Sequence, residues 1–230
     1  ADAVGPDITA LLCGSEGTLA LITKLWVRLT PAPQAFRTTV GIFDDSSAAC
    51  KSVSKIIASG ITPAAMEMMD GAMVRVVEET FNFGFPPDAQ ALLLIELDGP
   101  DATLDAQVER VESICREAGA KDLHSSADPK RRAELWKARK SAFGAIGKIS
   151  PSYCTQDACV PRSKLPEVLA EIMTIGQRYG LTITNVFHAG DGNVHPILLF
   201  DEDDPQQVRN IMEASHDILT FCISVGGALS

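Results

Sequence analysis

The chain has 230 residues, of which 46% are hydrophobic and 22% charged, with 20 Lys and Arg against 30 Asp and Glu. A net charge of −10 argues against nucleic acid or an anionic membrane as the main partner, because both attract a positive surface. The apolar fraction excludes a disordered chain. No apolar run reaches the roughly 18 residues of a membrane span. The six cysteines form no CxxC pair, which favours reduced thiols in a cytoplasmic protein.

The first 30 or so residues differ from the rest of the chain in their sequence pattern. A turn rich in glycine, Gly14–Gly17, lies between apolar stretches and predicts the edge of a larger sheet domain. Pro31 and Pro33 mark a boundary, since proline fixes φ and removes a hydrogen-bond donor. We therefore expect residues 1–31 to be the residual end of one domain, and residues 32–230 to be a second domain truncated at its C-terminus.

From residue 34 onward, strand-like and helix-like stretches alternate. Strands are predicted over 36–43, 64–68, 91–97, 121–125, 153–160, 182–187 and 194–200. Helices are predicted over 46–59, 70–81, 101–118, 128–146, 164–179 and 205–225, with Asp45, Asp101 and Asp128 as N-caps. Short links between neighbouring strands favour an antiparallel sheet. We expect an α+β fold with the helices on one face and two ferredoxin-like halves.

The segment FHAGDGNVHP, residues 187–196, holds two of the four histidines. If residues 190–193 form a four-residue hairpin loop, His188 lies directly across from His195. Cross-strand Cβ atoms are roughly 4.5–5.5 Å apart, so two imidazoles there could share one metal ion. The alternative is a pair of strand-end histidines bonded to backbone. From the residues alone the two interpretations are equal, and no third ligand is evident.

The predicted helix over 128–146 carries Arg139 in the middle of its apolar face, at about 40° from Leu135 on a helical wheel. A guanidinium directed into an apolar face is costly unless an anion meets it. The anion is either an internal carboxylate or the carboxylate of a substrate, which suits the fork of an arginine. Both interpretations stay open.

Two further segments could take part in ligand binding, but their patterns are less specific than those around the histidines and Arg139. The loop Gly14–Thr18 could bring backbone N–H groups to a ligand, although an ordinary turn is the favoured interpretation. The predicted strand over 153–160 places Tyr153, Thr155, Asp157 and Cys159 on one face. One interpretation is that this polar row lines a site near Arg139. The favoured interpretation is that it is a solvated face of the sheet.

Four segments together resemble a known family: GSEGTLALIT (14–23), WKARKSAFGAIGKISPSYC (136–154), QDACVP (156–161) and NVFHAGDGNVHP (185–196). They are similar to FAD-linked 2-hydroxyacid oxidoreductases of the vanillyl-alcohol-oxidase type. The resemblance is closest to the branch of bacterial glycolate oxidase catalytic D-subunits, with D-lactate and D-2-hydroxyglutarate dehydrogenases as relatives. It covers nearly the whole chain, and it implies that residues from about 32 onward form the cap, or substrate, domain.

The resemblance also implies roles for individual residues. His188 and His195 would be ligands of a divalent metal, zinc or iron, and Arg139 would hold the substrate carboxylate. The residues implied to contact FAD are Gly14, Ser15, Glu16, Gly17, Thr18, Ile22 and Asn193. The general base and a third metal ligand are expected beyond Ser230, so the chain alone should be inactive. Phe143 stands where some relatives have a threonine, which favours a small monocarboxylate over a longer dicarboxylate.

The resulting prediction is a flavin-dependent enzyme that oxidises a small 2-hydroxy acid, glycolate or D-lactate, to the 2-oxo acid. The resemblance implies partner subunits of flavin and iron–sulfur type, and a cytoplasmic location, peripheral to the inner membrane through those partners. Oligomeric state stays open. The competing hypothesis is a non-catalytic α+β module that binds a metal or a partner, in which the two histidines only hold structure. A nucleic-acid binder is disfavoured by the negative charge.

Overall fold

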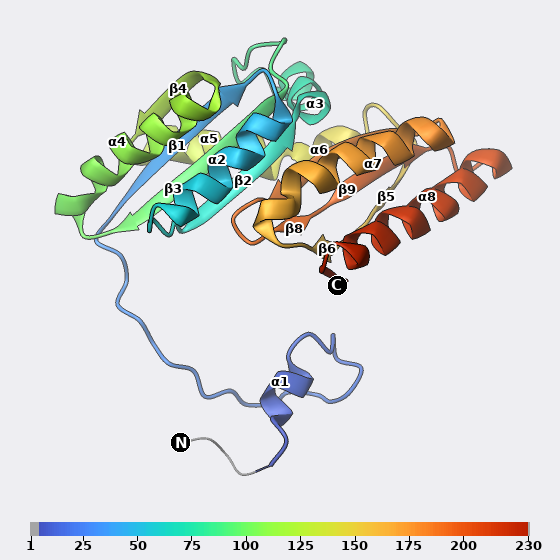
Figure 1. The fold of residues 1–230 in the computed structure, drawn as a ribbon, viewed down its shortest axis with the longest axis horizontal. Helices are drawn as coiled ribbons and strands as arrows, with labels where there is room; N and C mark the ends of the chain where they lie inside the picture. The colour runs from blue at the N-terminus through green and yellow to red at the C-terminus, as the bar shows by residue number, and fades with distance from the viewer. Residues whose placement is uncertain (1–4, 230) are drawn as a thin grey trace. The chain divides into compact units, whose positions relative to one another are not determined.

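The computed structural model describes residues 5–229, and the chain divides into two compact units (Figure 1). One reaches to Ala32 and the other runs from Pro33 to Leu229. Residues 1–4 and 230, which fall within the two predicted domains, lie outside the described residues. The first unit contains helix α1 (Ile8–Leu12) and no strand within residues 5–32. The prediction that this segment is the edge of a larger sheet domain stays a prediction, because a strand forms only beside a hydrogen-bonding neighbour and the other strands of that domain are not among the described residues.

The second unit is built on an antiparallel sheet of ten strands. Its main path runs β10-β6-β8-β7-β2-β3-β1-β4, and β9 branches from β7 to pair with β5. The bounds are β1 (Ala35–Phe43), β2 (Ala65–Asp70), β3 (Ala91–Gly99), β4 (Ala120–Ser126), β5 (Ser152–Thr155), β6 (Ala158–Cys159), β7 (Thr182–His188), β8 (Asn193–Val194), β9 (Pro196–Phe200) and β10 (Ala228–Leu229). The order β4-β1-β3-β2 in the first half is that of a ferredoxin-like unit. The predicted antiparallel α+β fold is confirmed.

Seven helices of the second unit cover this sheet (Figure 1). They are α2 (Ser46–Ala58), α3 (Gly71–Phe81), α4 (Asp101–Ala118), α5 (Pro129–Lys140), α6 (Ala142–Ile146), α7 (Leu165–Tyr179) and α8 (Pro205–Ser224), with a 3₁₀ turn at Arg162–Lys164. One buried cluster joins α2, α4, α7 and α8 to one face of the sheet. A second cluster joins α3, α5 and α6 to the other face. The long helices lie on one face as expected, but α3, α5 and α6 pack on the other, so the expectation that all helices lie on one face is wrong.

Several predicted elements differ in detail from the structure. The predicted helix over 128–146 is divided at Ser141, which ends α5 and precedes α6. The predicted strand over 153–160 divides into β5 and β6, and the strand over 194–200 is interrupted at His195. Asp101 is the first residue of α4 rather than its cap, which is Pro100 without a side-chain hydrogen bond. All six cysteines are free, but Cys13 and Cys159 are exposed.

The N-cap of α3 also joins the two halves of the sheet. The buried carboxylate of Asp70 accepts hydrogen bonds from the backbone N–H of Met73 at 2.8 Å and of Asn185 at 2.7 Å, and from the Asn185 side chain at 2.8 Å. Its loss removes a helix cap and leaves buried donors without partners. We expect Asp70→Ala to lower the free energy of unfolding by about 4 kcal/mol in urea titrations.

The matched control is Asp45→Ala. Asp45 caps α2 through one hydrogen bond to the backbone N–H of Ser47, at 2.9 Å, on an exposed position. Its replacement should cost about 1 kcal/mol. Equal losses from the two variants would show that the contacts between Asp70 and β7 add nothing to stability.

Candidate active site

Strands β2 and β7 bring an acid and a histidine together in the centre of the sheet. In the antiparallel register Glu67 pairs with His188, and the pair two positions along, Met69 with Val186, belongs to the buried cluster under α3, α5 and α6. Side chains two residues apart on a strand share a face. Glu67 and His188 therefore lie on the face that carries α5. His188 Nδ1 is 2.7 Å from Glu67 Oε1 and 2.9 Å from Oε2.

The hairpin after His188 has a different register from the predicted one. His188 pairs with Asn193, so the turn is 189–192 rather than 190–193, and His195 is not directly opposite His188. Continuing the register of Asn185 with Pro196 places His195 opposite Val186, diagonal to His188 on the same face. The two imidazole rings still approach, with centroids 5.3 Å apart and planes at 88°. The proximity was predicted correctly, and the directly opposed geometry was wrong.

The turn itself is fixed by close packing. Gly192 has a φ of +78°, and a Cβ there would lie 2.1 Å from the carbonyl oxygen of Val160. That distance leaves no room for any side chain. The backbone N–H of Gly190 donates to the carbonyl of Met66 at 3.0 Å, which ties the turn to the start of β2. The two histidines are thus held on either side of a rigid turn.

Helix α5 places Arg139 over the same part of the sheet. Its Nε donates to Glu67 Oε2 at 2.9 Å, and Nη2 lies 2.9 Å from the same oxygen. Arg139 is 8% exposed and Glu67 is 7% exposed, so this is a buried ion pair. Of the two anions that the sequence left open for Arg139, an internal carboxylate or that of a substrate, the internal one is therefore present. The guanidinium Nη1 has no protein partner among residues 5–229, so one edge of the arginine remains available.

A second carboxylate, half-buried, fixes the same helix. Glu96 on β3 accepts hydrogen bonds from Arg132 Nη2 at 2.8 Å, Trp136 Nε1 at 2.7 Å and Thr38 Oγ1 at 2.8 Å. Burial opposes the charge of Glu96, but these hydrogen bonds together hold its pKa below its usual range. Arg132, Trp136 and Arg139 are spaced to face one side of α5. The helix is thus docked on two sheet carboxylates, which sets the position of Arg139.

The environment of His195 differs from that of His188. His195 Nδ1 lies 3.6 Å from Asp157 Oδ1, a charge contact longer than a hydrogen bond. Burial lowers the pKa of His195; Asp157 opposes this shift, whereas His188 and Arg139 add to it. A lowered pKa keeps the imidazole neutral near pH 7, which is the form that binds a metal. The buried Asp157 Oδ1 has no hydrogen-bond partner among the described residues.

The rest of the polar row predicted beside Arg139 is open to solvent. Tyr153 is 46% exposed, and Thr155 and Cys159 are also exposed. Asp157 approaches His195, and Cys159 pairs with Asn193 in the backbone register of β6 and β8. Phe143, on α6, is 36% exposed. The favoured interpretation of the row as a solvated face therefore applies to its other three members.

Glu67 is the site residue that sequence reasoning missed. It stands between buried Met66 and Met68 in a short strand that is otherwise apolar up to Asp70. A charge in such a strand is a usable signal, because an acid is rarely buried without a partner. Its partners are 72 and 121 residues away in the chain, so no local pattern could identify them.

The two imidazoles form an incomplete metal-binding set. A catalytic zinc site uses three protein ligands and leaves one position open. In the part of the chain that the structure describes, no three His, Cys, Asp or Glu side chains are placed to hold one ion. The donor chemistry of His188 and His195 nevertheless suits a divalent cation. A carboxylate at each Nδ1 leaves the Nε2 atoms as the ligating nitrogens.

The residues predicted to contact FAD fall in both units. In the first unit, the backbone N–H and the hydroxyl of Thr18 donate to the carbonyl of Ser15 at 2.8 and 2.6 Å, which closes a turn. Glycines with φ of +80° and +77° flank it, at Gly14 and Gly17. Ile22 is 53% exposed. In the second unit, the buried Oδ1 of Asn193 has no partner among the described residues and could accept a hydrogen bond.

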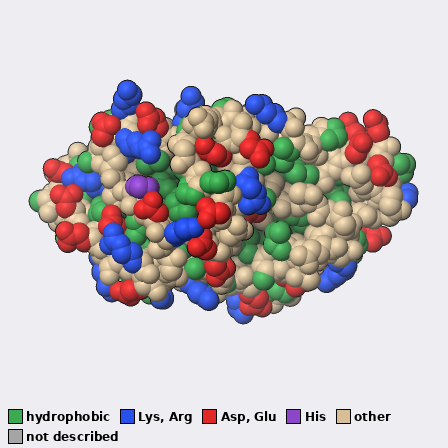
Figure 2. All heavy atoms as spheres, turned by 90° about the horizontal axis from the view of Figure 1, so that it is seen from above, with side chains coloured by type: hydrophobic (Ala, Val, Ile, Leu, Met, Phe, Trp, Pro, Cys, Tyr) green, Lys and Arg blue, Asp and Glu red, His purple; other side chains and the backbone are tan. Residues whose placement is uncertain are grey.

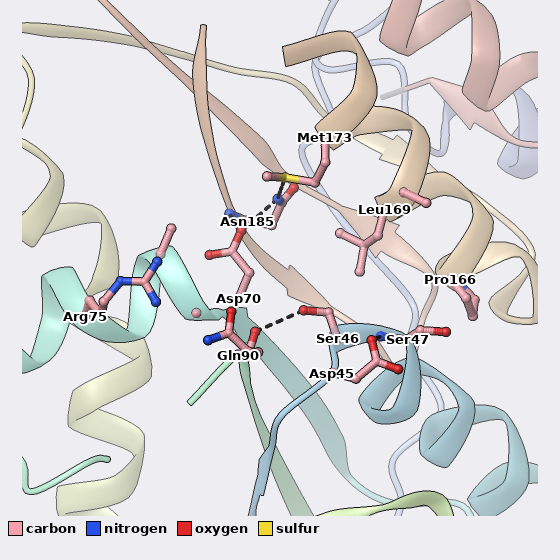
Figure 3. Close-up of a pocket in the computed structure, with 13 residues that line it drawn as sticks. Asp45, Ser46, Ser47, Asp70, Arg75, Gln90, Pro166, Leu169, Met173 and Asn185 are labelled. Carbon is pink, nitrogen blue, oxygen red and sulfur yellow. Dashed lines mark hydrogen bonds between the residues drawn. The ribbon is translucent and has the colours of Figure 1, made fainter. Parts of the chain in front are cut away.

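Two cavities lie near the centre of the sheet. A cavity of about 190 Å³ is lined by Glu67 and His188 together with Arg162 and the turn residues Gly190 and Asp191. A cavity of about 280 Å³ lies among α2, α3 and α7, where Asp70 and Asn185 point toward each other (Figure 3). Neither Arg139 nor the two histidines line this second cavity. Of Arg139, His188 and His195, only His188 lines the first cavity, and on that ground the first cavity is the candidate substrate pocket.

Figure 2 shows Lys and Arg side chains scattered among Asp and Glu side chains on the face that it presents. Within residues 5–229, no helix combines the length and the apolar character required to cross a bilayer.

Comparisons with known proteins place these observations in a family. The model of a family described as "FAD linked oxidases, C-terminal domain" matches residues 32–230. The chain is 43% identical over 229 residues to glycolate oxidase subunit GlcD of Escherichia coli K12, covering 100% of this chain and 46% of that protein. It is 34% identical to GlcD of Bacillus subtilis, covering 100% and 49%. It is 30% identical to the probable mitochondrial D-lactate dehydrogenase of Danio rerio, covering 98% and 45%.

Solved structures agree on the fold. An alkyldihydroxyacetonephosphate synthase superposes with a TM-score of 0.69 at 17% identity, covering 99% of this chain and 46% of that one. The 4-ethylphenol oxidase of Gulosibacter chungangensis gives 0.63 at 14% identity, covering 88% and 46%. Identities this low support the fold alone. The chain spans about half the length of the curated relatives that it matches.

Proposed function

The chain belongs to the family of FAD-linked oxidase C-terminal domains, as its motifs predicted, and from this premise we propose that it forms the substrate-binding part of a flavin-dependent 2-hydroxyacid oxidoreductase. The substrate would be a small 2-hydroxy acid, glycolate or D-lactate, which is oxidised to the 2-oxo acid. Names of relatives support this choice, because they include glycolate oxidase subunits and a probable D-lactate dehydrogenase.

The observation that carries the proposal is one buried carboxylate with a guanidinium on one side and an imidazole on the other. Arg139 and His188 both contact Glu67, and His195 lies next to His188. The open edge of Arg139 offers paired N–H donors, which suit a substrate carboxylate. A 2-hydroxy acid held there would have its hydroxyl group within reach of the two imidazoles. The cavity of about 190 Å³ beside Glu67 and His188 is of a size for a small acid.

The two histidines would hold a divalent cation, zinc or iron, together with a ligand outside the described residues. When bound, such a cation lowers the pKa of a neighbouring hydroxyl group. His188 and His195 would present neutral nitrogen donors; Glu67 contacts Nδ1 of His188 at 2.7 Å, and Asp157 lies 3.6 Å from Nδ1 of His195. Arg139 neutralises and orients the carboxylate, so that the hydroxyl group and C2 take one defined position.

Oxidation removes a hydride from C2 and a proton from the hydroxyl group. FAD, when bound, supplies the hydride acceptor. On this proposal Gly14–Thr18, Ile22 and Asn193 contact the flavin, and the unpaired Oδ1 of Asn193 supports that role. The general base would lie beyond Ser230. By the same resemblance, we propose partner subunits of flavin and iron–sulfur type in the cytoplasm, peripheral to the inner membrane.

A substrate screen on the full-length protein tests this proposal. The protein should be yellow and should be bleached anaerobically by glycolate or D-lactate, with turnover in the presence of an artificial electron acceptor. Because Phe143 stands where a polar partner for a second carboxylate would be needed, kcat/KM for D-2-hydroxyglutarate should be at least about tenfold lower. A protein that no 2-hydroxy acid bleaches would instead support a non-catalytic binding module.

A further inference from the structure

One carboxylate group connects the substrate arginine to a metal-ligand histidine. Oε2 of Glu67 receives both Nε and Nη2 of Arg139, and Oε1 lies 2.7 Å from Nδ1 of His188. The three side chains come from β2, α5 and β7, so Glu67 is their common point of contact. Its position is rigid, because it lies in the middle of β2 between β3 and β7.

The donor and acceptor rules fix the proton on His188. An ionised carboxylate only accepts hydrogen bonds, so a neutral imidazole beside it must carry its proton on Nδ1. Nε2 then keeps its lone pair, and Nε2 has no hydrogen-bond partner among residues 5–229. The same carboxylate takes the Nε edge of Arg139 and leaves Nη1 without a partner there. Glu67 therefore holds both His188 and Arg139 and leaves Nε2 of His188 and Nη1 of Arg139 free to bind a ligand.

We infer that Glu67 is a positioning residue, which sets the tautomer of His188 for metal binding and turns the free edge of Arg139 toward the substrate. This inference rests on the proposed function. A purely structural ion pair would require only Arg139, whereas the short contact with His188 gives Glu67 a second task. Carboxylates behind a ligating histidine orient the ring and raise its basicity, and their loss lowers metal affinity about 10- to 100-fold.

The substitution Glu67→Gln tests the inference directly, because it keeps the shape of the side chain and reverses the direction of its hydrogen bond with His188. The guanidinium of Arg139 only donates, so the amide oxygen must face it. The amide NH₂ group then faces Nδ1 of His188, which has to accept. The proton of His188 must move to Nε2, where it blocks metal binding.

The experiment uses metal-free full-length protein and two measurements. Imidazole ¹⁵N spectra report the tautomer of His188, which is assigned by its loss in His188→Gln. Titration with Zn²⁺ alone reports metal affinity without any turnover. In Glu67→Gln we expect the proton on Nε2 and Zn²⁺ affinity about 10- to 100-fold lower. For oxidation of glycolate and D-lactate, kcat should fall and KM should rise.

Glu96→Gln is the matched control. Glu96 is also a carboxylate under α5 with an arginine partner, Arg132, but it has no histidine neighbour among its contacts. The Glu96→Gln variant should keep the proton of His188 on Nδ1, and its Zn²⁺ affinity should stay within about twofold of the wild-type value. Unchanged tautomer and Zn²⁺ affinity in Glu67→Gln would overturn the inference, as would a wild-type protein that binds no Zn²⁺. Absence of oxidation by the wild-type protein, with the tautomer shift present, would overturn the proposed function alone.

Discussion

Replacing Arg139 by lysine in the full-length protein should lower kcat/KM for glycolate or D-lactate by about 100- to 1,000-fold. Lysine keeps the positive charge beside Glu67, so the buried carboxylate is not left unpaired. It loses the planar fork, which holds Glu67 by one edge and offers the other edge to the substrate. Misplacing the carboxylate by about 1 Å is enough for a 100-fold loss. Stopped-flow reduction of the flavin at a series of substrate concentrations measures both KM and the rate of hydride transfer.

The control for this variant is Arg132→Lys on the same helix. Arg132 is also paired with a sheet carboxylate, Glu96, at 2.8 Å, but it lies about two turns before Arg139. It should reduce stability somewhat and change KM for the hydroxy acid much less than Arg139→Lys does, because Trp136 still holds α5 on Glu96. If Arg139→Lys and Arg132→Lys behave alike, Arg139 has only a structural role and the proposed carboxylate contact is wrong.

The variant His195→Gln should lower Zn²⁺ affinity by more than about 100-fold, because it removes a ligand rather than the group behind one. The fold should persist, since His195 interrupts the sheet between β8 and β9 and its one ion-pair contact within residues 5–229, with Asp157, is 3.6 Å long. Oxidation of the 2-hydroxy acid should fall in parallel and should not return when metal is added. Metal analysis of the purified protein and Zn²⁺ titration measure these effects.

His216→Gln is the corresponding control, because His216 is an exposed histidine on α8 outside the site. It should bind Zn²⁺ as the wild-type protein does. A His195→Gln protein with full metal content and full activity would mean that the two rings are close for structural reasons only.

The fold was largely predictable because its signals are local. Apolar alternation marked the strands, and Asp45, Asp70 and Asp128 each cap a helix at or beside the predicted start. The breaks were not predictable in the same way. The end of α5 at Ser141 and the interruption at His195 depend on how α5, α6 and β9 pack on the sheet, and no local pattern encodes that packing.

The site was predicted in part for a similar reason. The short turn brings His188 and His195 together in either register, because a shift of two residues keeps side chains on the same face. The burial of Arg139 followed from its helical wheel. The anion that meets it could not be identified, because Glu67 is 72 residues away and reaches Arg139 only through the order of the sheet.

The central claim is that Arg139, His188 and His195 serve one pocket for a small hydroxylated acid. The most direct test is a crystal structure of the full-length protein with Zn²⁺ and D-lactate or its 2-oxo product. Anomalous scattering should place the metal on Nε2 of both histidines, with the ligand carboxylate on the Nη1 side of Arg139. A ligand bound elsewhere, for example in the cavity beside Asp70 and Asn185, with Arg139 still contacting Glu67 alone, would contradict the account.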